Sequence, residues 1–162
     1  MAKRYYLAYG SNLNMEQMRF RCPNAKPVGT AIIENNVLTF RGSNSGFYLT
    51  IEPKIGSKVP VGVWEVTAAD EAALDRYEGY PRFYFKAEIT VNVTSLHDGK
   101  TSGKRAFYYF MNEDSELGLP SETYVQTCLQ GYADFGFDKR ILKRTLERVR
   151  RVLDERKRKY KD

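Results

Sequence analysis

The spacing of apolar residues along the chain predicts a series of strands interrupted by short helices. Runs with strand-like composition or two-residue alternation occur at residues 4–9, 29–34, 37–42, 47–51, 59–66, 83–94 and 105–111. The polar segment Glu34-Asn35-Asn36 is expected to join the second and third runs as a hairpin. The run at 59–66 is largely apolar on both faces, which is typical of a barrel or a covered sheet.

The apolar spacing changes to that of a helix in four segments. These are Met15 to Cys22, Thr67 to Gly79, Pro120 to Gly136, and a final segment for which Asp138 is the expected cap. Asn14 and Gln17 have capping-box spacing, and so do Thr67 and Asp70. Gly79 and Gly136 are expected to end their helices, because glycine adopts the left-handed conformation there at little cost.

Many of the strands follow one another directly, so the predicted fold class is α+β. A small barrel or a strongly curved sheet is expected, and a doubly wound fold is excluded because strands and helices do not alternate. Residues 1–138 should form one domain. Residues 139–162 should form a basic C-terminal helix packed on it through an apolar stripe.

The net charge of +6 is concentrated at one end of the chain. Residues 139–162 contain 12 Lys or Arg and 4 Asp or Glu, a net charge of +8, whereas residues 1–138 carry a net charge of −2. This distribution weakens the case for a nucleic-acid-binding domain. Solubilising charge on a docked helix is the favoured interpretation, with nucleic-acid binding by this helix as an alternative.

The composition excludes several other classes of protein. A hydrophobic content of 42% and an aromatic content of 14% indicate a folded globule, and no apolar run is long enough to span a membrane. Two cysteines, Cys22 and Cys128, and a single histidine, His97, do not suggest a disulfide framework, a metal cage or a histidine-based triad. The N-terminus lacks a signal-peptide pattern, so a cytoplasmic protein is expected.

The segment from Tyr5 to Asn14 holds the first candidate for a functional site. An apolar strand ends abruptly in Gly10-Ser11-Asn12, and a helix-like pattern follows. Backbone N–H groups at such a helix start lack partners and suit a carboxylate, a phosphate or a carbonyl oxygen. From spacing alone, an ordinary β–α turn is the favoured explanation of the same residues.

Glu78 is the second candidate. It lies at the expected C-terminal end of a helix, where the dipole disfavours an anion. Tyr77, Tyr80, Phe83 and Tyr84 are close in sequence and would desolvate it. Both effects should raise the pKa of Glu78 and suit it to proton transfer near neutral pH, although a solvated glutamate at a helix end is the alternative.

Other candidate residues have simpler explanations. Tyr124 falls at a core position of its helix, and His97 falls in a turn. Cys22 and Cys128 are expected to be buried thiols. The segment 42–46 is expected to be a flexible loop that borders a ligand site at most, because it lacks the lysine of a phosphate-binding loop.

Three motifs together resemble the γ-glutamylcyclotransferase superfamily. They are Tyr6-Leu7-Ala8-Tyr9-Gly10-Ser11-Asn12-Leu13, then Tyr77-Glu78-Gly79-Tyr80-Pro81 followed by Tyr84, and Pro120-Ser121 with Tyr124. Their order and spacing match over residues 4–135, which leaves the basic tail unexplained. The resemblance implies a small mixed β-barrel with flanking short helices and a C-terminal helix.

The resemblance also implies an activity, the release of 5-oxoproline from a small-molecule γ-glutamyl compound without a metal or organic cofactor. It implies that the backbone around the first motif holds the γ-glutamyl group, which by position involves Tyr6, Leu7, Ala8, Tyr9, Gly10, Ser11 and Asn12. It assigns the acid/base role to Glu78 and a substrate contact to Tyr124. The amine released and the oligomeric state stay open, and a non-catalytic ligand-binding module of the same fold is the alternative.

Overall fold

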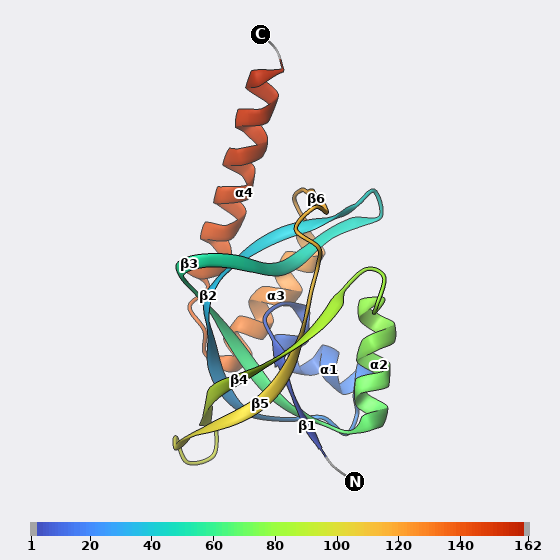
Figure 1. Cartoon of the computed structure of the whole chain (residues 1–162), viewed down its shortest axis with the longest axis vertical. Helices are drawn as coiled ribbons and strands as arrows, with labels where there is room; N and C mark the ends of the chain where they lie inside the picture. Colours follow the sequence, from blue (N-terminus) through green and yellow to red (C-terminus); the bar gives the residue numbers. More distant parts are fainter. Residues whose placement is uncertain (1–2, 161–162) are drawn as a thin grey trace.

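The computed structural model describes residues 3–160 and contains a closed five-stranded β-barrel (Figure 1). Its strands are β1 (Arg4–Ala8), β2 (Lys26–Ser43), β3 (Gly46–Val66), β4 (Phe85–Ser95) and β5 (Thr101–Phe110). The order is β3–β1–β5–β4–β2, and pairing of β2 with β3 closes the barrel. Only the β1–β5 pair is parallel among these strands, so the expected α+β fold with a mixed barrel is confirmed.

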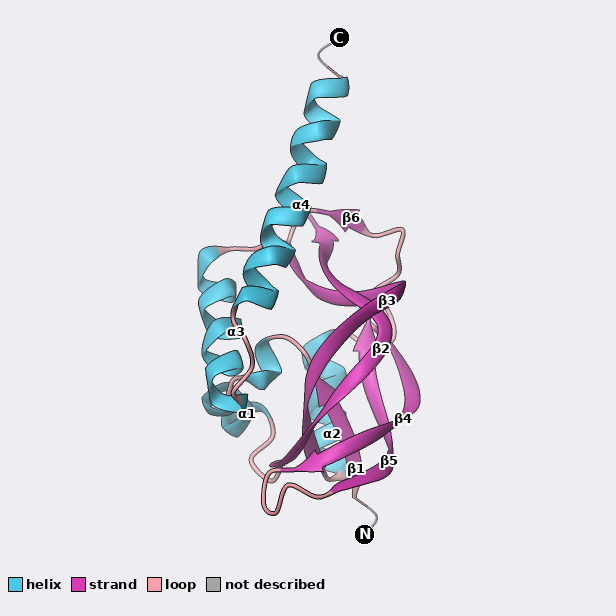
Figure 2. Cartoon of the chain, turned by 90° about the vertical axis from the view of Figure 1, so that its left-hand side faces the viewer, coloured by secondary structure: helices cyan, strands magenta, loops and turns pink. Residues whose placement is uncertain are grey.

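The helices lie around the outside of the barrel (Figure 2). They are the 3-10 turn η1 (Ser11–Leu13), then α1 (Met15–Arg21), α2 (Ala68–Glu78), α3 (Glu122–Phe135) and α4 (Arg140–Lys159). A two-residue strand, β6 (Glu116–Leu117), pairs with the outer part of β2. The first half of α4 lies beside β2, and its second half extends beyond the barrel (Figure 1).

The predicted hairpin at residues 34–36 is wrong, because this segment lies inside the single long strand β2. Residues 47–51 and 59–66 likewise belong to one strand, β3. The register of the pair is interrupted, since Glu34 pairs with Lys58 whereas Asn36 pairs with Pro53. Asn35 has a φ of 54° and accepts a hydrogen bond from the Gly56 N–H at 3.0 Å. A bulge uses the same residue types as a turn, which explains the error.

The expected helix starts are largely confirmed. The side chains of Asn14, Thr67 and Ser121 each accept a hydrogen bond from the backbone N–H three residues later. Asp138 differs, because the N-cap of α4 is Lys139. The Asp138 carboxylate nevertheless accepts a hydrogen bond from the Arg140 N–H at 3.0 Å. Asp138 lies one residue before the N-cap and still satisfies one of the backbone N–H groups that lack a partner at the helix start.

The C-terminal helix packs on the barrel through its apolar stripe. Leu142 and Val149 are buried and belong to the main core, and the Arg148 guanidinium donates to the Leu38 carbonyl. Residues 1–2 of the predicted domain and residues 161–162 of the predicted basic helix, which include Lys161, lie outside the described residues. Within residues 3–160, no helix is long and apolar enough to cross a membrane.

Candidate active site

A cavity of about 360 Å³ opens between the end of β1, the end of α2 and the start of α3. Its lining is mostly aromatic with a few polar groups, as is common for small-molecule sites. The lining residues are Tyr6, Tyr9, Gly10, Ser11, Asn12, Ser45, Tyr48, Leu49, Arg76, Tyr77, Glu78, Gly79, Phe83, Tyr84, Tyr109 and Tyr124. Segments far apart in the sequence therefore meet at one site.

The loop after β1 is held by contacts with β3 and α3. The Trp64 indole N–H on β3 donates to the Asn12 carbonyl at 3.0 Å. The Asn14 amide caps α1 and also donates to the Thr127 carbonyl of α3 at 3.2 Å. A Cβ added at Gly131 of α3 would lie 2.6 Å from the Asn14 backbone nitrogen, so glycine there permits the close approach of helix and loop. These contacts hold the loop at the cavity wall.

Glu78 is the last residue of α2 and its carboxylate reaches the same loop. The helix ends there because Gly79 adopts the left-handed conformation with a φ of 66°. The Asn12 amide donates to Glu78 Oε1 at 3.3 Å and to the Tyr6 hydroxyl at 3.0 Å. Glu78 therefore lies at a helix end, as the sequence predicts, and its carboxylate contacts the Gly-Ser-Asn loop.

Burial within the aromatic cavity raises the pKa of Glu78 from its ordinary 4.5 to about 7, although the positive charge of Arg21 opposes the rise. Tyr77, Phe83 and Tyr84 line the cavity beside it, as expected from the sequence. Tyr80 does not line it; its ring is 41% exposed and lies 4.6 Å from the Lys86 ammonium. The carboxyl group is thus able to change protonation near neutral pH.

Several tyrosines of the cavity lining have hydroxyl groups that bond to the backbone. Tyr84 donates to the Leu49 carbonyl at 2.8 Å, and Tyr9 donates to the Tyr109 carbonyl at 2.7 Å. The Tyr124 hydroxyl accepts the Leu49 N–H at 3.1 Å. Burial raises the pKa of Tyr9, Tyr84 and Tyr124, so these hydroxyls stay protonated and act as neutral hydrogen-bonding groups.

Gly10 lets Tyr124 approach the loop closely. A Cβ at position 10 would lie 3.1 Å from the Tyr124 hydroxyl oxygen and 3.5 Å from the Leu49 side chain. The φ of Gly10 is −128°, so close approach, and not the left-handed conformation, is what favours glycine here. The start of α3 therefore contacts the loop through a side chain that reaches into the cavity.

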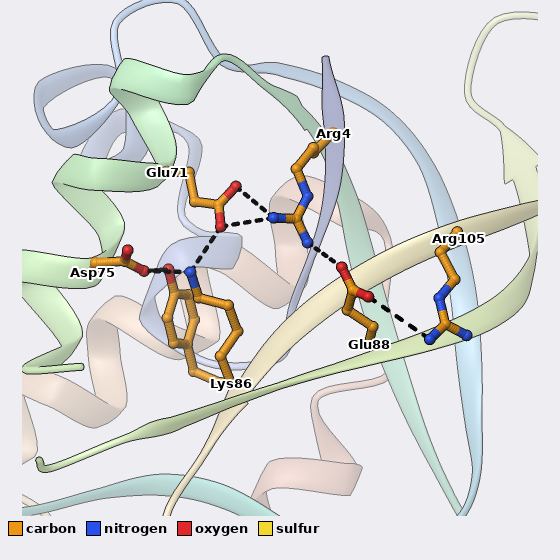
Figure 3. A network of polar contacts seen from close by, with 7 residues as sticks. Arg4, Glu71, Asp75, Lys86, Glu88 and Arg105 are labelled. Atoms are coloured by element: carbon orange, nitrogen blue, oxygen red, sulfur yellow. Dashed lines mark hydrogen bonds and ion pairs between the residues drawn. The ribbon is translucent and has the colours of Figure 1, made fainter. Parts of the chain in front are cut away.

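An ion-pair network links β1, α2 and β4 (Figure 3). The Lys86 ammonium lies 2.7 Å from Glu71 and 2.8 Å from Asp75, and Arg4 bridges Glu71 and Glu88. Asp75 in turn accepts the Tyr109 hydroxyl at 2.6 Å. The network joins α2 to β4 and orients a tyrosine of the cavity lining.

The structure brings together seven of the nine site residues expected from the sequence: Tyr6, Tyr9, Gly10, Ser11, Asn12, Glu78 and Tyr124. Leu7 and Ala8 do not line the cavity; they are buried in β1, where they pair with Val63 and Gly62. Leu7 and Ala8 contribute by anchoring the strand that carries the loop.

Sequence reasoning missed several lining residues. Tyr48, Arg76 and Tyr109 come from segments that appeared to be ordinary strand or helix. Strand alternation could have placed Tyr109 on the same face as Phe107, but not beside the loop. Cys22 and Cys128 are buried free thiols, as expected, and His97 is exposed in a turn. Among residues 3–160, no cluster of His, Cys, Asp and Glu is suited to hold a metal ion.

Comparison with known proteins identifies the family to which this chain belongs. The family model described as "Gamma-glutamyl cyclotransferase, AIG2-like" matches residues 6–126, which include the loop, Glu78 and Tyr124. A protein of Bos taurus named gamma-glutamylcyclotransferase is 31% identical over 139 residues, covering 81% of this chain and 71% of its own length. This chain belongs to the γ-glutamylcyclotransferase family.

Solved structures share the barrel of this γ-glutamylcyclotransferase family member. A gamma-glutamyl cyclotransferase is 26% identical with a TM-score of 0.71, covering 89% of this chain and 86% of that structure. A yeast protein described as a γ-glutamyl cyclotransferase specific to glutathione is 13% identical with a TM-score of 0.60, covering 93% and 97%. At that identity the likeness supports the fold alone.

Proposed function

We propose that this protein cyclises a γ-glutamyl amide, releasing 5-oxoproline and a free amine, with Glu78 as the general acid and base. The observation that carries the proposal is the placement of the Glu78 carboxyl group, with a pKa raised to about 7, beside the Gly10-Ser11-Asn12 loop in one cavity. Membership of the γ-glutamylcyclotransferase family and the name of the bovine relative support it.

The reaction is intramolecular, so the protein needs to fold the glutamyl chain and move protons. Ionised Glu78 takes a proton from the substrate α-ammonium group, and the neutral amine attacks the γ-carbonyl carbon. This forms the ring C–N bond and a tetrahedral oxyanion. Holding the amine and the carbonyl together supplies a proximity effect worth several kcal/mol of the barrier.

The tetrahedral intermediate then collapses with further proton transfers through the same carboxyl group. Protonated Glu78 gives its proton to the departing nitrogen, takes one from the ring nitrogen, and the original C–N bond breaks. The proton taken from the ring nitrogen passes to the released amine, which returns Glu78 to its ionised form. A carboxyl group with a pKa near 7 suits both directions of transfer.

The cavity lining suits the remaining parts of the substrate. The first N–H groups of η1, at the Gly10-Ser11-Asn12 loop, have no partner within the turn and are suited to bind the glutamyl carboxylate or the oxyanion. The Tyr124 hydroxyl, 3.1 Å from the Leu49 nitrogen, is suited to contact the glutamyl chain from the other side. The aromatic walls exclude water from the reacting groups.

The test is a panel of γ-glutamyl compounds scored for 5-oxoproline. γ-Glutamyl dipeptides, γ-glutamyl-lysine and γ-glutamyl amines are incubated with the wild-type protein and with Glu78→Gln. We expect product from at least one compound with the wild type and a loss of at least about 1000-fold with the variant. Wild-type binding of these compounds without product would instead favour the non-catalytic binding module, and near-wild-type turnover by Glu78→Gln would remove Glu78 from the mechanism.

A further inference from the structure

Arg21 lies behind the candidate active site, at the end of α1, and does not itself line the cavity. Its guanidinium stacks on the Tyr77 ring with a distance of 3.7 Å from Cζ to the ring centroid. Nη1 donates to Asn12 Oδ1 at 2.6 Å, and Nη2 donates to Gln17 Oε1 at 2.8 Å. The side chain is half-buried.

This contact decides which way the Asn12 amide points. A guanidinium has only donors, so the amide oxygen of Asn12 must face it and the NH₂ group must face the other way. That NH₂ group is the one that donates to Glu78 Oε1 at 3.3 Å and to the Tyr6 hydroxyl at 3.0 Å. With the amide reversed, an oxygen would face the carboxylate and repel its ionised form.

The positive charge of Arg21 also favours the ionised form of the Glu78 carboxyl group, to which Arg21 is linked through the Asn12 amide. The other titratable side chains that line the cavity with Glu78 are seven tyrosines from several segments and one arginine of its own helix. They are Tyr6, Tyr9, Tyr48, Tyr77, Tyr84, Tyr109, Tyr124 and Arg76. Arg21 opposes the rise in the pKa of Glu78 that burial causes.

We propose that Arg21 is a positioning residue that sets the proton affinity of Glu78 by fixing the Asn12 amide and by its own charge. The proposal rests on the proposed function for its meaning in catalysis, but the contact it describes exists without substrate. Removing Arg21 takes away a positive charge and frees the amide to reverse. Both changes favour the protonated carboxyl group and raise its proton affinity.

The test compares Arg21→Met, which keeps the length of the side-chain stem, with Arg21→Lys, which keeps a positive charge and only donors. Arg19→Met on the exposed face of α1 is the matched control, because it removes the same charge from the same helix. The Glu78 carboxyl carbon is followed by NMR titration, with its resonance assigned from its absence in Glu78→Gln. The pH profile of kcat/KM is measured on the same proteins.

We expect Arg21→Met to raise the Glu78 midpoint by about 1 pH unit and to move the acidic limb of the rate profile by the same amount. Arg21→Lys should show less than half of that change, and Arg19→Met almost none. A midpoint in Arg21→Met within about 0.2 units of the Arg19→Met value would overturn the proposal. So would Arg21→Lys matching Arg21→Met. If the wild type released no 5-oxoproline, the proposed function would fail while the NMR comparison still tested Arg21.

Discussion

Replacement of Glu78 by glutamine should stabilise the protein at alkaline pH while it abolishes turnover. The wild-type carboxyl group must ionise inside an aromatic cavity, whereas the amide of the variant carries no charge. Glutamine retains an oxygen that can accept the Asn12 amide N–H. The substitution therefore removes the cost of a buried charge with little loss of contacts.

The size of the effect follows from the pKa of Glu78, which rises from 4.5 to about 7 on folding. Because the folded protein holds the proton more tightly, stability from this group is fully present below about pH 4.5 and is lost as the pH rises to about 7. The rise corresponds to about 3 kcal/mol at 1.36 kcal/mol per pKa unit. Because Glu78 is half-buried, solvent screens part of this effect. We therefore expect a loss of stability of about 2 kcal/mol from this group between pH 5 and 8.5.

The assay is urea unfolding of the wild type and Glu78→Gln at pH 5 and at pH 8.5. The free energy of unfolding of the variant, relative to the wild type, should increase by about 2 kcal/mol from the lower to the higher pH. Glu155→Gln, an exposed carboxylate of α4, is the control and should show no comparable change. An equal difference at both pH values would refute the argument that Glu78 is forced to ionise in a desolvating site.

Three further substitutions test the packing around the site. Gly131→Ala should destabilise the protein by about 1–3 kcal/mol and raise KM, because the added Cβ would lie 2.6 Å from Leu13 and displace α3 from the loop; unchanged kinetics and unfolding would contradict this. Tyr132→Phe should be neutral or stabilising by about 1 kcal/mol in thermal unfolding, since its hydroxyl is the one buried side-chain polar atom of residues 3–160 without a partner. Leu142→Ala should cost about 3 kcal/mol in urea unfolding, and a cost below about 1 kcal/mol would show that α4 docks weakly.

Local sequence patterns predicted the helices and strands well where the deciding interaction lies between residues that are close in the sequence. Asn14, Thr67 and Ser121 start helices because their side chains satisfy the first free N–H groups, and this depends only on neighbours in the sequence. The segment around Asn35 was misassigned because its partner, the bulge near Gly56, lies 21 residues away. Whether such a segment turns or bulges depends on strand pairing, which local composition does not specify.

The candidate site could be predicted only in part for the same reason. Glu78 and the loop stand out because their residue types conflict with their local setting, a carboxylate at the wrong helix end and a polar loop after an apolar strand. Tyr109 and Arg21 show no such conflict, since a tyrosine in a strand and an arginine at a helix end are ordinary. Their importance comes from contacts with Asp75 and Asn12 that only the fold creates.

The central claim is that Glu78 moves protons in the formation of 5-oxoproline. The most direct measurement is kcat/KM for 5-oxoproline release between pH 5 and 9, with the best substrate of the panel. The account predicts that the wild-type rate rises with pH through one ionisation near 7, and that any residual rate of Glu78→Gln lacks this ionisation. A wild-type rate that is flat from pH 5 to 8, or the same ionisation in Glu78→Gln, would contradict it.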